Sequence, residues 1–185
     1  MQALDALLNR VSVPRLAEPA PTPAQREQLF RAALRAPDHG QLRPWRFLTI
    51  EGAAREQLGE LFARVQQQRH PEASAELLAK ARAMPLRAPL LITVIARLQA
   101  GHKVPESEQL LAAGCAAHAI LLAAHAQGIG AVWRSGELSH DPAVRDGLGL
   151  SADERIVGFL YLGTPQGERR TPPVLAVEDF VSRWP

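Results

Sequence analysis

Cysteine and lysine are nearly absent from this chain of 185 residues. Cys115 is the only cysteine, so one chain can form neither a disulfide nor a cysteine cluster around a metal. Lys80 and Lys103 are the only lysines, and arginine therefore carries nearly all of the positive charge. Arginine makes planar, two-pronged contacts with phosphates and carboxylates, although a high arginine content can equally reflect genome composition.

Runs of one charge and long apolar runs are also missing. The formal net charge is only +2, and acidic residues are interspersed in 53–60 and 137–154. This balance argues against a protein whose main role is to bind nucleic acid. No apolar run approaches the roughly 20 residues that cross a bilayer, and residues 1–10 have no apolar signal core. We expect a single cytoplasmic domain over residues 1–185, with neither membrane nor nucleic acid as a partner.

Several motifs of nucleotide binding and catalysis are absent. The sequence has no Gly-x-Gly-x-x-Gly, no Walker loop, no Gly-x-Ser-x-Gly and no recognisable Cys/His nucleophile pair. His118 and His125 lie on one predicted helix, but a metal site needs further ligands nearby. An enzyme without a nucleophile, a metal cage or paired carboxylates depends on a bound organic cofactor.

The periodicity of apolar residues predicts an α+β fold. A nearly continuous β-branched run at 88–98 predicts a central strand that is buried on both faces. Further strands are expected at 45–51, 131–133 and 155–162, and the tail at 174–185 is a candidate strand-like arm. Helices are expected at 2–9, 23–35, 53–68, 74–84, 106–127 and 141–148.

The segment from Arg35 to Trp45 is the most distinctive loop. Pro37 and Pro44 disfavour helix, so the loop should be extended or turn-like. Its arginine, histidine and glutamine side chains offer donors, and Trp45 offers an aromatic face. Such a loop can seat a flat anionic ligand, and the alternative is a surface loop that merely joins a helix to a strand.

A second candidate site is the segment from Arg10 to Arg15, which follows the first predicted helix. Two arginines here flank Ser12, and charged donors beside a hydroxyl suit a phosphate group. The pattern Arg-x-Ser is equally that of a solvated turn after a helix.

Four segments together resemble the nitroreductase family of flavoproteins, and most closely its small bacterial YdjA-like members. The segments keep the family's order and spacing across almost the whole chain. They are RVS at 10–12, RAPDH at 35–39 with PW at 44–45, AQGIGAVWRSG at 126–136 and IVGFLYLGTP at 156–165.

The resemblance implies a nitroreductase-like fold, in which helices flank a central mixed β-sheet of about four to five strands. It also implies an intertwined homodimer that shares FMN at the subunit interface, with the Ala-rich 106–127 helix supplying much of that interface. The implied activity passes a hydride from NAD(P)H via FMN to a nitroaromatic, a quinone or a similar acceptor. The alternatives are a flavin- or small-molecule-binding protein of the same fold without NAD(P)H turnover, and an arginine-rich nucleic-acid-binding module.

The resemblance assigns FMN-binding roles to residues near the N-terminus. Arg10, Val11 and Ser12 would hold the phosphate or ribityl end of FMN, with Val11 offering its backbone. Arg35 and His39 would reach the flavin that is bound mainly by the other subunit.

Residues of the second half of the chain would surround the flavin ring. By resemblance, Trp133, Arg134 and Ser135 line the ring, and a backbone N–H near Gly136 faces its N5 atom. The resemblance implies no protein side chain acting as a nucleophile and no metal. The segment at 123–128 is sometimes assigned to the NAD(P) nucleotide in close relatives, and the alternative is that it is a plain helix C-cap. Its residues are Ala123, Ala124, His125, Ala126, Gln127 and Gly128.

The chain departs from the family at three positions of the site. Val11 stands where many members have a second arginine, Pro14 where many have a basic residue, and Arg43 where many have glutamine. Arg15 can substitute for the basic residue, and Arg169-Arg170 falls roughly where larger members place a phosphate clamp. These departures leave the exact contacts with the flavin ring open.

Overall fold

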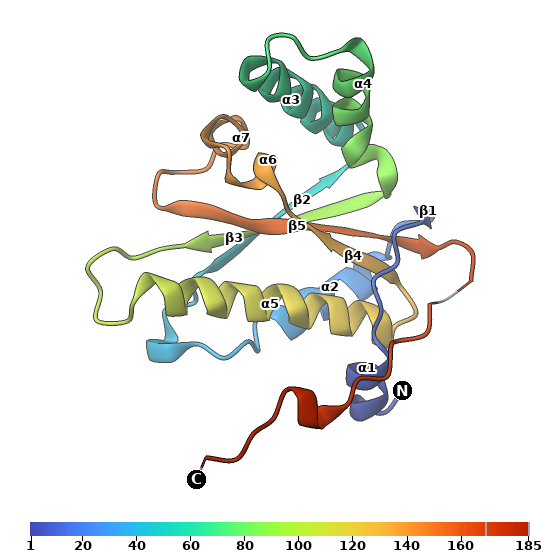
Figure 1. The fold of residues 1–185 in the computed structure, drawn as a ribbon, viewed down its shortest axis with the longest axis vertical. Helices are drawn as coiled ribbons and strands as arrows, with labels where there is room; N and C mark the ends of the chain where they lie inside the picture. The colour runs from blue at the N-terminus through green and yellow to red at the C-terminus, as the bar shows by residue number, and fades with distance from the viewer. Residues whose placement is uncertain (169, 185) are drawn as a thin grey trace.

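The computed structural model describes residues 1–168 and 170–184, which form three layers with helices on both faces of one β-sheet (Figure 1). The helices are α1 (Ala3–Asn9), α2 (Pro23–Ala33), α3 (Ala53–Arg69), α4 (Ala75–Ala83), α5 (Glu106–Ala126), α6 (Glu137–His140) and α7 (Pro142–Gly147). The strands are β1 (Leu16–Ala17), β2 (Trp45–Glu51), β3 (Leu90–Arg97), β4 (Gly130–Arg134) and β5 (Glu154–Pro165). Short 3-10 turns are η1 (His39–Gln41), η2 (Met84–Arg87) and η3 (Val177–Asp179).

The sheet has the strand order β1–β5–β3–β2, and β4 pairs with β5 on the edge opposite β3. Every pairing among the described strands is antiparallel, so the mixed sheet that the resemblance implied is wrong within one chain. The physical reason is the connection between β2 and β3. Two helices, α3 and α4, return the chain to the end of the sheet it left, whereas a parallel neighbour needs a crossover.

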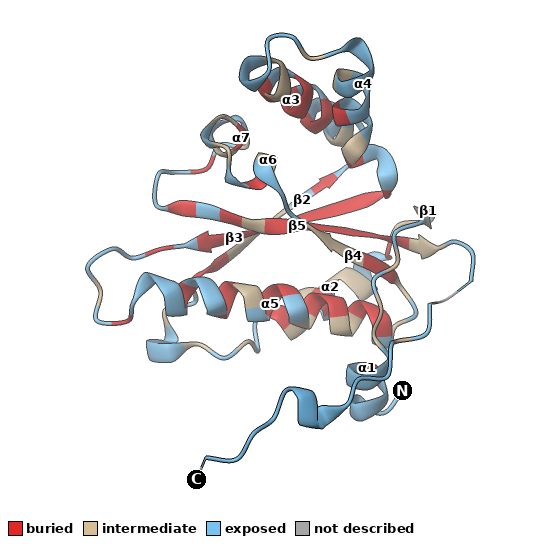
Figure 2. Cartoon of the chain, viewed as in Figure 1, coloured by how far each residue is buried: buried red, intermediate tan, exposed pale blue. Residues whose placement is uncertain are grey.

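Strand β3 lies in the middle of the sheet and is buried on both faces, as its unbroken apolar run predicted (Figure 2). Leu90 and Ile92 pack against the apolar side chains of α2 and α5. Leu91 and Ile95 pack on the opposite face, against α3. The sheet therefore separates two apolar clusters, and each fully buried aliphatic side chain contributes roughly 1.5–3 kcal/mol through removal from water.

Most predicted helices and strands recur with their ends shifted by a few residues. The Thr22 hydroxyl accepts from the Gln25 N–H at 3.3 Å and the Gln25 side chain accepts from the Thr22 N–H at 2.8 Å, which caps α2.

The expected strand-like arm is wrong for the described part of the tail, which contains only the turn η3. Phe180 and Trp184 there are exposed, and the tail projects away from the body (Figure 1).

Helix α5 corrects one expectation from the sequence. Its 21 residues are long and apolar enough to cross a membrane by length and composition alone. One such helix is weak evidence, because a core helix of a soluble protein meets the same criteria. The side chains of Ala113, Ala117 and Ile120 are buried against the sheet, which is what a core helix requires.

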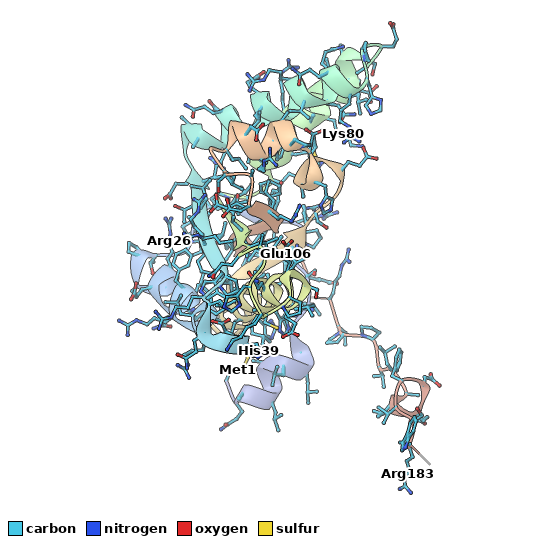
Figure 3. All side chains as sticks on the ribbon, turned by 90° about the vertical axis from the view of Figure 1, so that its left-hand side faces the viewer. Met1, Arg26, His39, Lys80, Glu106 and Arg183 are labelled. Carbon is cyan, nitrogen blue, oxygen red and sulfur yellow. The ribbon has the colours of Figure 1, made fainter. Side chains whose placement is uncertain are left out.

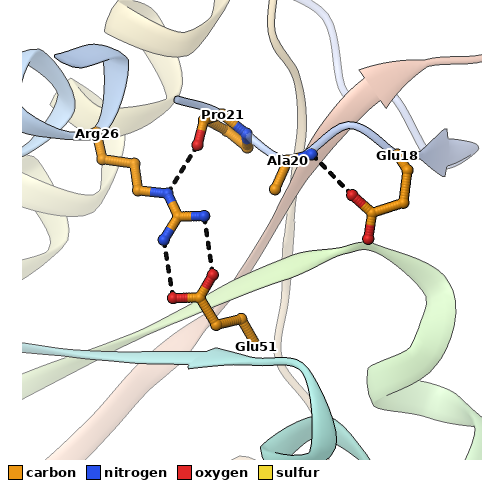
Figure 4. A network of polar contacts seen from close by, with 5 residues as sticks. All are labelled: Glu18, Ala20, Pro21, Arg26 and Glu51. Atoms are coloured by element: carbon orange, nitrogen blue, oxygen red, sulfur yellow. Dashed lines mark hydrogen bonds and ion pairs between the residues drawn. The ribbon is translucent and has the colours of Figure 1, made fainter. Parts of the chain in front are cut away.

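Two arginine–carboxylate pairs join elements that are distant in the sequence. Arg26 of α2 donates two hydrogen bonds of 2.8 Å to Glu51 at the end of β2, and its Nε donates to the Pro21 carbonyl at 2.8 Å (Figure 4). These hydrogen bonds lower the pKa of Glu51. In the second pair, Arg46 of β2 reaches across β3 and donates two hydrogen bonds of 2.8 Å to Glu154 of β5.

Glu154 is buried, and the hydrogen bonds from Arg46 lower its pKa to about 2 from an ordinary 4.5. A carboxylate with a depressed pKa stabilises the fold fully above its unfolded pKa, and this contribution is lost as the pH falls toward the folded pKa. We expect Glu154→Gln to reduce the free energy of unfolding by about 2 kcal/mol at pH 7. The difference from wild type should shrink between pH 4.5 and pH 2, as measured by urea unfolding.

Glu178→Gln is the control, because Glu178 is exposed in the tail and its removal should change stability little at any pH. If the free energies of unfolding of Glu154→Gln and wild type differ by the same amount down to pH 2, the ionised Arg46–Glu154 pair is not the source of that difference.

Candidate functional site

A pocket of ≈ 520 Å³ lies where the end of β4 meets the α3–α4 hairpin and α6. This volume falls within the range of roughly 300–1,000 Å³ that is typical of small-molecule sites. One rim is the segment from Trp133 to Gly136, which includes all three residues assigned to the flavin ring. Apolar walls come from both sides of the gap, namely Phe62, Leu77, Met84 and Phe159.

Positive charge in the pocket exceeds negative charge. Lys80 of α4, which is exposed, and Arg134 of β4 line it, and neither side chain forms a hydrogen bond or an ion pair with any described residue. The acid in the pocket, Glu137, is held by Arg69 at 3.1 Å. Two cations without acidic partners in an apolar pocket favour a planar ligand that carries or develops negative charge.

Arg134 and Tyr161 form the polar side of this pocket. The guanidinium carbon of Arg134 lies 5.6 Å from the centre of the Tyr161 ring, in the range of a cation–π interaction. The Nε of Arg134 is buried and has no hydrogen-bond partner among the described residues. Burial raises the pKa of Tyr161, and the cations Arg134 and Arg87 offset part of that rise, so the phenol is protonated at neutral pH.

Trp133 owes its position to a glycine on the neighbouring strand. Its indole lies directly over Gly158 of β5, where a Cβ would collide with the indole Nε1. Trp133 pairs with Leu160 in the β4–β5 ladder, so the register of the sheet brings the ring over Gly158. The glycine in the IVGFLYLGTP segment is therefore required by the close approach of the indole.

A basic hollow of ≈ 170 Å³ lies beside the end of β5 and is lined by Ser12, Arg15 and Arg170. Glu168 lines it as well, so its charge is mixed. Arg170 lines this hollow and its role as a phosphate clamp stays a prediction, while Arg169 lies outside the described residues.

Arg10 and Val11 lie next to this hollow but face another side. They line a space of only ≈ 10 Å³ against His125 at the end of α5, which has no room for an organic ligand. The Val13 N–H donates to the Ala131 carbonyl at 2.9 Å, so this segment follows the free edge of β4. Along that edge, Ala131 and Arg134 are about 10 Å apart, which places the basic hollow and the pocket at neighbouring points of one strand.

The loop from Arg35 to Trp45 lines neither the pocket nor the basic hollow. His39 Nδ1 lies 2.7 Å from Glu108 Oε2, at the start of α5, and Arg35 is exposed. The loop contains the turn η1, and Asp38 holds it by accepting from the Arg43 N–H at 2.7 Å. The aromatic face expected from Trp45 is wrong, because this side chain is 8% exposed and belongs to the core.

One chain does not bring the two groups of predicted flavin contacts together. His39 lies at the start of α5 and Arg10 at its end, and the helix rise gives a separation of about 25 Å. Figure 3 shows Lys80 in the upper part of the molecule and His39 well below it. Arg35 and His39 therefore contribute nothing to the ≈ 520 Å³ pocket of their own chain.

The segment from Ala123 to Gly128 forms a C-cap. The N–H groups of Gly128 and Ile129 donate to the His125 and Ala124 carbonyls at 3.0 and 2.9 Å, and Gly128 has a φ of 74°. The Gln127 side chain donates to the Ala123 carbonyl at 3.1 Å. These contacts explain the segment as a helix end, and its NAD(P) role stays a prediction.

Reasoning from the sequence missed the residues that α4 and β5 bring to the pocket. Lys80 had a signal, because it is one of only two lysines in an arginine-rich chain. Tyr161 had one as well, because it is the only tyrosine and stands in the last of the resembling segments. Leu77 and Met84 had no such signal in the sequence, because their spacing is that of ordinary core residues.

We expect Gly158→Ala to displace the Trp133 indole and to cost about 2 kcal/mol, as overpacking does. The Trp133 indole N–H resonance should shift in proton–nitrogen NMR, and urea unfolding should show the loss of stability. Gly114→Ala is the matched control, since a Cβ at Gly114 of α5 meets nothing within 4 Å. That variant should be slightly more stable than wild type, and an unshifted Trp133 resonance in Gly158→Ala would contradict the packing described.

Comparisons with known proteins agree with these features. The pattern described as "Nitroreductase family" matches residues 7–164. The chain is 50% identical over 168 residues to an Escherichia coli protein named "Putative NAD(P)H nitroreductase YdjA", with 90% of each chain covered.

Solved structures share the fold. A nitroreductase-like family protein from Bacillus cereus has a TM-score of 0.81 and 22% identity, covering 100% of this chain and 96% of that one. A structure described as a putative nitroreductase in complex with FMN, from Desulfovibrio desulfuricans, has a TM-score of 0.75 and 22% identity, covering 100% and 99%. From the family match and the 50% identity, the chain belongs to the nitroreductase family.

Proposed function

We propose that this protein is an FMN-dependent NAD(P)H oxidoreductase, which reduces a nitroaromatic, a quinone or a similar acceptor. The observation that carries the proposal is the ≈ 520 Å³ apolar pocket with the unpaired cationic side chains Lys80 and Arg134, together with the basic hollow beside the end of β5. The names of the relatives and the FMN in the Desulfovibrio desulfuricans structure support the same activity.

The residues present fit FMN at both of its ends. Ser12, Arg15 and Arg170 would hold the phosphate, because charge-assisted hydrogen bonds from arginine suit a dianion. The apolar walls and the segment from Trp133 to Gly136 would hold the ring. Bound FMN would supply the redox chemistry by accepting a hydride from NAD(P)H and passing it to the acceptor.

The side chains of the pocket have positioning and electrostatic roles in this proposal. Lys80 and Arg134 would stabilise negative charge that develops on a bound ring, and their lack of acidic partners keeps this charge available. Phe62, Leu77 and Met84 would exclude water from one side of the ring. None of these residues acts as a nucleophile.

We further propose that the complete site belongs to a homodimer. Arg35 and His39 lie about 25 Å from Arg10 along α5, so they can serve a flavin only in a second copy of the chain. An antiparallel arrangement of two α5 helices would bring the start of one beside the end of the other. The cytoplasm stays the expected location.

The first test is the visible absorption spectrum of the purified protein with added FMN, followed by NADH or NADPH without oxygen. We expect one FMN per chain and bleaching of the flavin band by at least one nucleotide. Binding without bleaching would favour a flavin-binding protein without turnover, and no binding would exclude the proposal.

Ser12→Ala and Arg15→Gln should each raise the Kd for FMN about tenfold, because each removes a hydrogen bond to the phosphate. Quenching of flavin fluorescence measures this Kd. Arg183→Gln is the control, since Arg183 lies in the projecting tail (Figure 3) and should leave the Kd unchanged. Equal effects of Arg15→Gln and Arg183→Gln would point to nonspecific charge attraction.

The shared site can be tested by mixing Arg15→Gln and His39→Ala subunits. If each site takes Arg15 from one chain and His39 from the other, a mixed dimer has one intact and one doubly altered site. We expect each pure variant to bind FMN weakly and the mixed dimer to regain about half of the high-affinity sites. A mixed dimer with no tight site would place both residues in the same chain's site.

A further inference from the structure

Tyr161 is a buried polar residue whose hydroxyl forms no hydrogen bond with the described part of the protein. Its side chain is 2% exposed, and its recorded polar contact is the cation–π interaction with Arg134. Buried tyrosine hydroxyls usually find a partner, because burial without one loses the hydrogen bonds to water. The Tyr161 hydroxyl is not itself a fully buried atom without a partner, as Arg134 Nε is, so it opens into the ≈ 520 Å³ pocket that Tyr161 lines and is available there as a donor.

The neighbouring Arg134 is in the same situation. Its guanidinium has five N–H donors and forms no side-chain hydrogen bond with any described residue, and its Nε is buried. A buried donor without a partner and a phenol that opens into the pocket therefore stand together on one side of it. Buried polar groups usually have a hydrogen-bond partner, so this pair suits a partner outside the chain.

We propose that Tyr161 is a ligand-contacting residue, whose hydroxyl donates a hydrogen bond to an oxygen or nitrogen acceptor of a planar molecule in this pocket, while its ring holds Arg134 in place. This inference rests on the proposed function and adds a residue to it. The ligand chemistry is a conjugated carbonyl, nitro or ring-nitrogen acceptor. Both the flavin and the electron acceptor offer such groups, and the experiment separates these two sources.

The physical setting suits a donor rather than a base. Burial keeps the phenol protonated, and Arg134 stacks on the face of the ring, leaving the hydroxyl free to donate. The position is fixed by the sheet, because Tyr161 pairs with Leu91 of β3 and Val132 of β4 on its two sides. A donor on a central strand is held more rigidly than one on a loop.

The test compares Tyr161→Phe with wild type. This substitution removes the hydroxyl and keeps the aromatic face for Arg134. Thr93→Val is the matched control, since Thr93 is a buried hydroxyl without a hydrogen-bond partner in the described structure and lies outside the pocket. Both substitutions delete one hydroxyl from the central strands β3 and β5 of the same sheet.

Two binding measurements identify the source. If the flavin accepts the hydrogen bond, the Kd for FMN should rise about fivefold in Tyr161→Phe and stay unchanged in Thr93→Val. If the electron acceptor accepts it, the Kd for FMN should stay unchanged and the KM for a quinone should rise about fivefold. Unchanged values for both, or equal changes in Thr93→Val, would overturn the inference.

Wild-type protein gives an independent measurement, because Tyr161 is the only tyrosine. Its carbon-13 Cζ resonance can be followed through a pH titration with and without FMN or quinone. A ligand that accepts from the phenol should raise the pKa of Tyr161, since the neutral form is then favoured. Absence of any shift with either ligand would overturn the inference, whereas failure of wild type to bind FMN would instead overturn the proposed function.

Discussion

The rest of the structure depends on the pairing of β5 with strands on both of its sides. A central strand must satisfy its backbone N–H and C=O groups, and β5 does so with β3 on one side and with β4 and β1 on the other. This pairing fixes which side chains of β4 and β5 share a face. It therefore brings Arg134 beside Tyr161, and Trp133 over Gly158, before any ligand is considered.

The same pairing determines what the sheet contributes to the pocket. The end of β4 supplies Arg134 and β5 supplies Tyr161 and Phe159, whereas the α3–α4 hairpin supplies Phe62, Leu77 and Lys80 from a separate layer. A hairpin of two helices between neighbouring antiparallel strands is a long connection, and it arches over one end of the sheet (Figure 1). The gap beneath it is lined on one side by whatever the sheet presents there, which here includes Arg134, a cation without an acidic partner among the described residues.

Local sequence signals predicted most of this fold because they are short-range. The apolar run at 88–98, which predicted the central strand, needs no knowledge of the rest of the chain. Strand direction depends on how connections pack, and the mixed sheet was accordingly wrong. Trp45 was misplaced for a related reason, because a tryptophan beside a polar loop has the same sequence signature whether its ring faces solvent or the core.

The site was predicted less completely than the fold. Trp133, Arg134 and Ser135 do line the pocket, while their contacts with a flavin ring stay a prediction. Lys80 and Tyr161 come from segments that only the folded chain brings near them. The split between Arg10 and His39 is likewise a fact of three-dimensional distance along α5, which no local pattern contains.

The surface of a single chain gives an independent reason to expect a second copy. Leu4, Leu7 and Leu8 share one side of α1 and are more than half exposed, and Leu111 of α5 is also exposed. The tail adds Val174, Phe180 and Trp184, which contact little of their own chain. Apolar groups at this density, on helices beside the predicted flavin contacts, are costly in water unless another surface covers them. A homodimer would bury these groups and bring His39 to Arg10 in the same step, so stability and site assembly would have one cause.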